Sequence, residues 1–224
     1  RTHNGPMPRV LYLSASNLIG GAEESLLTLL GALDRSRFVP LLGAPAIGRP
    51  DFAGMTLSSR AAALGIETLE LPLARFQRTW NPFRLLAARN RIAAGRRWVA
   101  EIVQARGIDL LHANSLMAGL YAAGAPLVCH VRDLRVPRLA AHAVSRRASL
   151  FVAISQVVAA MARQRLGSNV RCLSNGVDTE RFRPGAGVSA ATAGKNQSEA
   201  GTKREGAYLL MVGHLAPWKR HDLF

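Results

Sequence analysis

One short apolar stretch, residues 126–131, ends in polar side chains for which a hydrophobic core has no use. It contains His130 and is followed by Arg132 and Asp133, so an imidazole, a guanidinium and a carboxylate lie within four residues. Such a group at the end of a strand favours a site that binds the hydroxyl groups of a small molecule such as a sugar. A histidine that only packs at the strand end is the alternative.

A second polar group follows residues 110–113. His112 lies in this stretch, and Asn114 and Ser115 come directly after it. Because a lone histidine more often has a structural role, that role is the alternative for His112. We expect His112 and Asn114 to lie on the same ligand-binding edge as His130.

Two glycine-containing loops follow predicted strands, and the first is a candidate for contact with a phosphorylated ligand. Gly20 and Gly21 precede a leucine-rich helix pattern, where small residues leave backbone N–H groups open to an anion. The pattern is not Gly-x-Gly-x-x-Gly, and an ordinary tight turn is the alternative. Asn175 and Gly176 follow the last apolar stretch, where Asn-Gly usually forms a turn.

Two further residues have a simple structural explanation beside a functional one. Ser155 precedes a helix pattern, and an N-cap is its expected role, because no glycines flank it as in a nucleophile elbow. Lys219 follows Pro217 at the start of a predicted helix, where a cation and free N–H groups together suit a diphosphate. A solvated lysine is the alternative.

The elements that must position these residues alternate along the chain. Apolar runs of strand length alternate with stretches of helical period, which is typical of an α/β fold with a doubly wound, Rossmann-like parallel sheet. In such sheets ligands bind beyond the carboxyl ends of the strands. The predicted strands are residues 9–14, 38–42, 67–71, 110–113, 126–131, 150–154 and 170–173, and the predicted helices are residues 22–33, 52–64, 82–106, 115–123, 137–147 and 156–165.

Composition narrows the class of protein. Apolar residues make up 49% of the 224 residues and charged residues only 19%, which argues against disorder. Cys129 and Cys172 lie far apart in apolar stretches, and we expect both to be reduced thiols. No apolar run reaches the roughly 20 residues of a membrane-spanning helix and no signal peptide is visible, so the cytoplasm is the expected location.

The formal net charge of +15 allows three kinds of partner: nucleic acid, an anionic membrane surface or a phosphorylated substrate. The most basic stretch runs from Arg75 to Arg97 and has Phe76, Trp80 and Phe83 among its arginines. These arginines spread over more than one face of the predicted helix. A solvated helix surface is therefore the alternative to a binding site.

The chain divides into one domain and the start of another. Residues 7–184 form the predicted Rossmann-like domain, the small and polar residues 185–206 predict a flexible linker, and residues 207–224 predict the start of a second domain. Because the chain starts at Arg1 and ends at Phe224 within a predicted helix, we expect it to be a fragment.

Three segments, in this order, resemble the retaining glycosyltransferases of family 4 (glycosyltransferase group 1). They are Val10-Leu-Tyr-Leu-Ser14 with Gly20-Gly-Ala-Glu23, then Leu173-Ser-Asn-Gly-Val-Asp-Thr-Glu-Arg-Phe-Arg-Pro184, and finally Val212-Gly-His-Leu-Ala-Pro-Trp-Lys219. The resemblance covers nearly the whole chain apart from the linker. It implies a GT-B fold, in which a first domain that binds most of the acceptor faces a second domain that binds the nucleotide-sugar.

The resemblance also implies roles for individual residues. His130 matches the first-domain histidine at the reacting sugar and is the catalytic candidate. Arg220 replaces a usual glycine and can offset the charge lost where His214 replaces the usual arginine. The donor-binding candidates are Gly20, Gly21, Asn175, Gly176, His214, Lys219 and Arg220, and the acceptor-side candidates are His112, Asn114, Arg132 and Asp133.

The implied function is the transfer of a hexose, with retention, from a nucleotide-sugar to a polysaccharide or a lipid-linked glycan, without a metal or another cofactor. Peripheral contact with the inner membrane face is compatible with this function, and no nucleic-acid partner is expected. The alternatives are a nucleotide-sugar epimerase of the same fold and a basic, non-catalytic domain that binds membrane or nucleic acid. Because the glutamate pair of the family's second domain is missing, we expect this chain to be inactive alone.

Overall fold

The computed structural model describes residues 6–46, 54–72, 81–134, 137–180 and 182. Two compact units divide the chain, Arg1–Asp178 and Thr179–Phe224, and all the described helices and strands belong to the first unit. The predicted linker at 185–206 and the predicted second-domain start at 207–224 lie outside the described residues. These boundaries, and the one at residue 184, therefore stay predictions.

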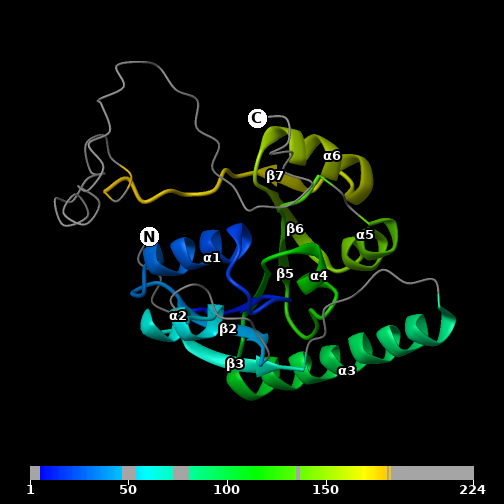
Figure 1. Ribbon diagram of the computed structural model, residues 1–224, viewed down its shortest axis with the longest axis horizontal. Helices are drawn as coiled ribbons and strands as arrows, with labels where there is room; N and C mark the ends of the chain where they lie inside the picture. Colours follow the sequence, from blue (N-terminus) through cyan, green and yellow to red (C-terminus); the bar gives the residue numbers. More distant parts are fainter. Residues whose placement is uncertain (1–5, 47–53, 73–80, 135–136, 181, 183–224) are drawn as a thin grey trace, which may run out of the picture. The chain divides into compact units, whose positions relative to one another are not determined.

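The first unit is built on a sheet of seven parallel strands (Figure 1). In space the strands follow the order β3-β2-β1-β4-β5-β6-β7. The predicted doubly wound α/β fold is thereby confirmed. The strands are β1 (Arg9–Leu13), β2 (Val39–Pro45), β3 (Glu67–Leu71), β4 (Leu110–Ala113), β5 (Leu127–Val131), β6 (Ala148–Ala153) and β7 (Val170–Cys172).

Local signals set the limits of the helices that connect these strands. The longest, α3, follows Asn81, whose Oδ1 accepts hydrogen bonds from the backbone N–H groups of Phe83 and Arg84. It ends at Gly107, which has φ of 58°. The described helices are α1 (Gly21–Ala32), α2 (Leu57–Ala63), α3 (Pro82–Arg106), α4 (Leu116–Gly119), α5 (Arg138–Ser145) and α6 (Gln156–Leu166).

Two helices differ clearly from their predicted ranges. Helix α2 begins at Leu57 rather than at residue 52, because Thr56 and Ser59 form a reciprocal capping box at its start. Helix α4 ends at Gly119 rather than at residue 123, because the backbone N–H groups of residues 120–122 bond to the carbonyl oxygens three residues back instead of four. The other described ends lie close to their predicted positions; the largest difference is at β2, which ends at Pro45 rather than at residue 42.

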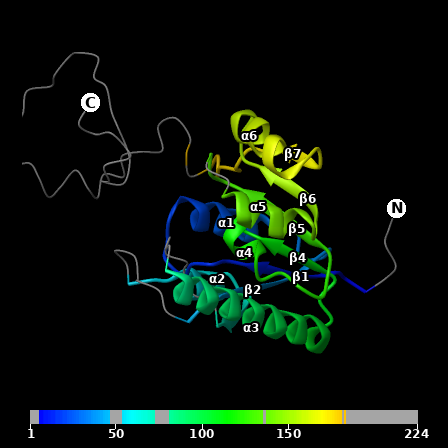
Figure 2. The ribbon, with the colours of Figure 1, turned by 90° about the vertical axis from the view of Figure 1, so that its right-hand side faces the viewer.

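Helices cover both faces of the sheet (Figure 2). Successive side chains of a strand point to opposite faces, so β1 contributes to two cores. Leu11 packs in a cluster with Val99 of α3 and with buried residues of α4, α5 and α6. Val10 packs in a second cluster with Leu26 of α1 and with buried residues of α2. Burial on both faces explains why the strands are nearly continuous apolar runs.

The strand order reverses between β1 and β4. From β1 the chain builds outward to β2 and β3, and it then returns to place β4 on the other side of β1. At such a reversal the connections after the two central strands diverge to opposite faces, which makes their carboxyl ends the usual ligand site of this fold. The start of α1 and the residues after β4 lie at this point.

Candidate functional site

One guanidinium connects the segments that meet at the strand reversal. Arg132, directly after β5, donates from Nε to the backbone O and to Oδ1 of Asn114, at 3.0 and 3.1 Å. Its Nη1 donates to Ser25 Oγ of α1 and to Asn175 Oδ1, both at 3.1 Å. Ser25 Oγ donates in turn to Asn175 Oδ1 at 2.9 Å. Arg132 thus joins the ends of β4 and β5, the first turns of α1 and the segment after β7.

Asn114 holds this guanidinium against α1. Its side chain is buried, with 2% of the residue exposed. Oδ1 accepts a second hydrogen bond from Arg132 Nη2 at 2.7 Å, and Nδ2 donates to the backbone O of Ala22 at 3.2 Å. The acceptors that Arg132 reaches are all neutral. Burial lowers the pKa of Arg132, and the charges of Glu23 and Asp133 oppose this effect, so the site keeps a partly buried positive charge.

Two histidines lie in contact beside Arg132, with their ring planes tilted by 55°. His112 Nε2 lies 3.0 Å from His130 Nδ1, and Arg132 Nη2 lies 3.4 Å from the same nitrogen. Because a guanidinium can only donate, we infer that Nδ1 of His130 accepts and that its proton is on Nε2. His112 must then donate from Nε2. The ring of Tyr12 packs against the other side of this pair, with its centroid 4.9 Å from that of His112 and the two planes tilted by 35°.

Both imidazoles are neutral at neutral pH. Burial, and then the charge of Arg132, lower the pKa of His112 to about 4. Burial, followed by His112 and Arg132, lowers the pKa of His130 to about 3. Among the described residues, Nε2 of His130 has no hydrogen-bond partner. This N–H is therefore a neutral donor that is available to a ligand oxygen.

The start of α1 is open to an anion. Gly20 is its N-cap, and no side chain caps this end. Within the described part of the chain, the backbone N–H groups of Gly21 and Ala22 have no acceptor, as expected for the first turn of an uncapped helix. Gly20 has φ of −140°, so its backbone does not require glycine. A Cβ atom at Gly21 would meet nothing within 4 Å, which leaves the space over this turn free.

The structure brings five of the predicted residues together. His112, Asn114, His130, Arg132 and Asn175 form one hydrogen-bonded group, in agreement with the expectation that they share an edge of the sheet.

The remaining predicted residues take less part in this group. Asp133 and Gly176 are exposed and have no hydrogen bonds within the described residues, although the charge of Asp133 acts on Arg132. His214, Lys219 and Arg220 lie outside the described residues, so their predicted role in binding a diphosphate is neither supported nor contradicted.

Two participants were not predicted. Ser25 stands among the leucines of α1, and its sequence neighbours give no reason to single it out. Tyr12 looks like a core residue of β1, and it is 4% exposed. Only the register, which pairs Tyr12 with His112 across two parallel strands, shows that it supports the site. Ser155 accepts a hydrogen bond from Val158 N, which confirms its predicted role as the N-cap of α6.

The described residues show neither a metal site nor a disulfide nor a membrane-spanning helix. They contain no group of three or more His, Cys, Asp and Glu side chains placed to hold a metal ion. Cys129 and Cys172 are both free thiols, as predicted. No described helix has both the length and the apolar character needed to cross a bilayer.

Comparison with protein families gives one assignment. The model of Glycosyltransferase Family 4 matches residues 19–181, which is well over half of the chain. The matched range includes α1, β4, β5 and the segment after β7, and so every described residue that contacts Arg132. No curated protein sequence matches the chain.

Solved structures share the fold. HepE of Anabaena, crystallised in complex with UDP-glucose, is 25% identical, with a TM-score of 0.54 over 78% of this chain and 45% of that protein. A glycosyltransferase from Rickettsia africae is 16% identical, with a TM-score of 0.53 over 85% and 48%. The lipopolysaccharide outer core galactosyltransferase WaaB is also 16% identical, with a TM-score of 0.52 over 77% and 46%. The chain therefore spans about half the length of these proteins.

Proposed function

The chain belongs to Glycosyltransferase Family 4, and we propose that it forms the acceptor-side half of a retaining enzyme. This enzyme would transfer a hexose from a nucleotide-sugar to a glycan or lipid-linked acceptor. The observation that carries the proposal is the convergence, at the strand reversal, of an uncapped helix N-terminus, a partly buried guanidinium and a neutral imidazole donor. These three groups suit a ligand that combines phosphate with sugar hydroxyls.

The positive groups have a role in the departure of the leaving group. As the bond between the sugar C1 and the diphosphate oxygen breaks, negative charge grows on the diphosphate. The N–H groups of Gly21 and Ala22 are oriented donors that gain strength with that charge. Arg132 adds a fixed positive charge beside them. We expect His214, Lys219 and Arg220 to hold the diphosphate from the second domain, without a metal ion.

His130 has the second role. Its Nε2–H donates to an oxygen of the transferred sugar, while His112 and Arg132 both engage Nδ1 and fix the ring. With a pKa of about 3, His130 does not act as a charged acid at neutral pH. Its hydrogen bond therefore orients the transferred sugar and polarises the oxygen that accepts it. The new bond forms between C1 and an acceptor hydroxyl, whose proton leaves with the diphosphate. Asn175 and Gly176 line the donor side, and Asp133 the acceptor side.

The donor class is supported by a relative. HepE of Anabaena was crystallised with UDP-glucose and with UDP and glucose. A nucleoside diphosphate hexose is therefore the first donor to test.

The transfer test uses a chimera, because we expect the 224-residue chain alone to give no turnover. Residues 1–184 are joined to the second domain of HepE and supplied with UDP-glucose and a panel of glycan and lipid-linked acceptors. We expect release of UDP, and a product whose anomeric proton shows retention by NMR. His130→Gln should lower kcat by about a hundredfold, while the exposed His142→Gln should leave it unchanged. Turnover by the isolated chain, or a folded chimera that binds UDP without any transfer, would count against the proposal.

The acceptor side is tested on the chain itself. We record imidazole and guanidinium NMR resonances while adding the same acceptors. Because the acceptor hydroxyl must reach C1 of the sugar that His130 contacts, a bound acceptor should lie next to His130 and shift the His130 Nε2 and Arg132 Nε signals, and His130→Ala should weaken its binding by about tenfold. His142→Ala is the matched control. Binding that leaves both signals unmoved would place the acceptor elsewhere.

Contact with a membrane is a further part of the proposal. At the start of α3, Phe83, Leu85 and Leu86 are 81%, 50% and 49% exposed. Arg84 and Arg89 lie beside them, and this end of α3 projects beyond the sheet in Figure 1. Apolar side chains with flanking arginines suit an anionic lipid surface.

Vesicle co-sedimentation tests this contact. We expect binding to vesicles that contain phosphatidylglycerol and little binding to pure phosphatidylcholine. Replacing Phe83 and Leu86 together by Ser should weaken the binding by about tenfold or more, because two inserted side chains are lost. Leu139→Ser removes a side chain that is 87% exposed on α5 and is the control. Equal loss in both variants would contradict a specific role for α3.

A further inference from the structure

A hollow of about 240 Å³ lies at the opposite edge of the sheet from the candidate site. Its lining includes Leu127, the first residue of β5, and Arg147, which directly precedes β6. The candidate site is at the carboxyl ends of the strands, whereas this hollow is at their amino ends. The five residues of β5 separate the two by about 13 Å.

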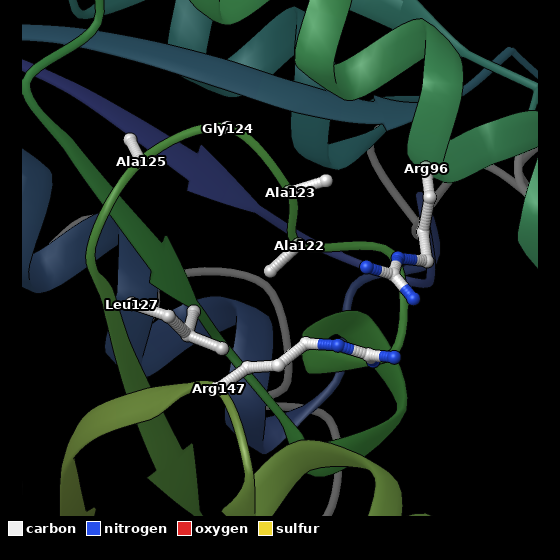
Figure 3. Close-up of a pocket in the computed structure, with 7 residues that line it drawn as sticks. All are labelled: Arg96, Ala122, Ala123, Gly124, Ala125, Leu127 and Arg147. Carbon is white, nitrogen blue, oxygen red and sulfur yellow. The ribbon is translucent and has the colours of Figure 1, made fainter.

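Two arginines from separate elements share this hollow. Arg96 enters from the middle of α3 and Arg147 from the turn between α5 and β6, and Figure 3 shows both guanidinium groups extending toward the same space. Neither side chain forms an ion pair or a hydrogen bond within the described residues. Nε of Arg96 is fully buried without an acceptor, an arrangement that costs free energy unless a partner arrives.

The two charges also oppose each other. Burial lowers the pKa of Arg147, and the charges of Arg96 and Arg146 lower it further. The other lining residues are Ala122, Ala123, Gly124 and Ala125, so the part of the chain that the structure describes places no acidic side chain in the hollow. Two guanidinium groups that face one space without a counter-charge create a local positive potential.

The backbone of the hollow adds donors. Within the described part of the chain, the N–H groups of Ala123, Gly124 and Ala125 have no hydrogen-bond acceptor. Gly124 has φ of 94°, and a Cβ atom there would lie 3.2 Å from Cβ of Val103 and 3.3 Å from Cα of Ala100. The glycine therefore lets this loop lie directly against α3, which fixes the loop beside Arg96.

We propose that Arg96, Arg147 and the loop 122–125 form a binding site for a phosphate group, separate from the glycosyl-transfer site. Guanidinium groups match the geometry of phosphate oxygens, and free backbone N–H groups complete such sites. The volume is below the roughly 300–1,000 Å³ of pockets that hold whole organic ligands. The ligand is therefore a phosphate monoester or inorganic phosphate, and a lipid headgroup is one source of the same chemistry.

The test compares two double variants of the full chain with equal charge. Arg96→Gln with Arg147→Gln removes the pocket charges, of which Arg96 is half-buried and Arg147 is exposed, and Arg97→Gln with Arg146→Gln removes the exposed sequence neighbour of each. Calorimetry with inorganic phosphate should show saturable binding that the pocket pair weakens by about a hundredfold and the control pair by less than about threefold. Vesicles of phosphatidylcholine with and without phosphatidic acid form the second arm.

Each result decides the proposal. A loss of binding that occurs only in the Arg96 and Arg147 double variant supports the proposal. The ligand is then free phosphate if inorganic phosphate binds, and a lipid headgroup if only phosphatidic acid vesicles bind. Equal weakening in both pairs indicates net charge alone and overturns it, as does the absence of binding in both arms. Because the two arginines lack protein partners, the pocket variant should be at least as stable as wild type. A strongly destabilised pocket variant would show a structural role and also overturn the proposal.

Discussion

The contacting pair His112 and His130 predicts that the protein loses stability as the pH falls from 7 to 5. The pKa values of His112 and His130 in the native state are about 4 and about 3, whereas an unfolded histidine has a pKa near 6.5. Between pH 7 and pH 5 the unfolded chain therefore takes up protons at these two positions and the native state takes up almost none. Because the unfolded state binds more protons, its free energy falls relative to that of the native state as the pH falls, and the free energy of unfolding decreases.

The magnitude follows from these pKa values. Between pH 7 and pH 5, protonation lowers the free energy of an unfolded histidine by about 2 kcal/mol, whereas a histidine that stays neutral in the native state gains nothing. Two such residues give about 4 kcal/mol. Against a typical total stability of about 5–15 kcal/mol, the change is readily measured.

Urea denaturation at pH 7 and pH 5, followed by circular dichroism, is the assay. Wild type should lose about 4 kcal/mol more than the His112→Gln, His130→Gln double variant over this range. His142→Gln removes an exposed histidine and should behave like wild type. The single variant His112→Gln should show about half of the effect if the double variant is too unstable to compare. A wild-type excess below about 1 kcal/mol, or imidazole NMR titrations with ordinary pKa values near 6.5, would refute the inferred burial of a neutral pair.

Three further predictions concern stability at neutral pH, each measured by urea denaturation. Arg132→Ala leaves the buried acceptors of Asn114 unsatisfied and should destabilise the protein by about 2–4 kcal/mol; a loss below about 1 kcal/mol would mean that water replaces the guanidinium without penalty. Gly124→Ala should cost more than Gly167→Ala, by about 1–3 kcal/mol, because both have positive φ but only Gly124 lies against neighbouring atoms; equal losses would contradict the close approach to α3. Ser155→Ala should cost about 1 kcal/mol through the lost N-cap, and Ser155→Asn should recover most of it.

Local signals in the sequence were sufficient to predict the framework. Hydrophobic period and helix caps depend on residues within a few positions of each other, and they placed all seven strands and both ends of α3. Two helix limits were missed although the residues that set them are close in the sequence. The capping box of Thr56 and Ser59 starts α2 at Leu57, and α4 ends at Gly119 because the next backbone N–H groups bond three residues back rather than four.

The sequence by itself determined the type of fold, the family and the edge of the sheet at which polar residues gather. Only the tertiary structure decided which of these residues touch. Arg132 and Ser25 are 107 residues apart, and Ser25 and Asn175 are 150 apart. Their contacts depend on the order of strands in the sheet, which places β1 beside β4 and brings the segment after β7 over α1. Pairing order arises from packing across the whole domain, so no local period or motif encodes it, and the same reason applies to Arg96 and Arg147 at the opposite edge.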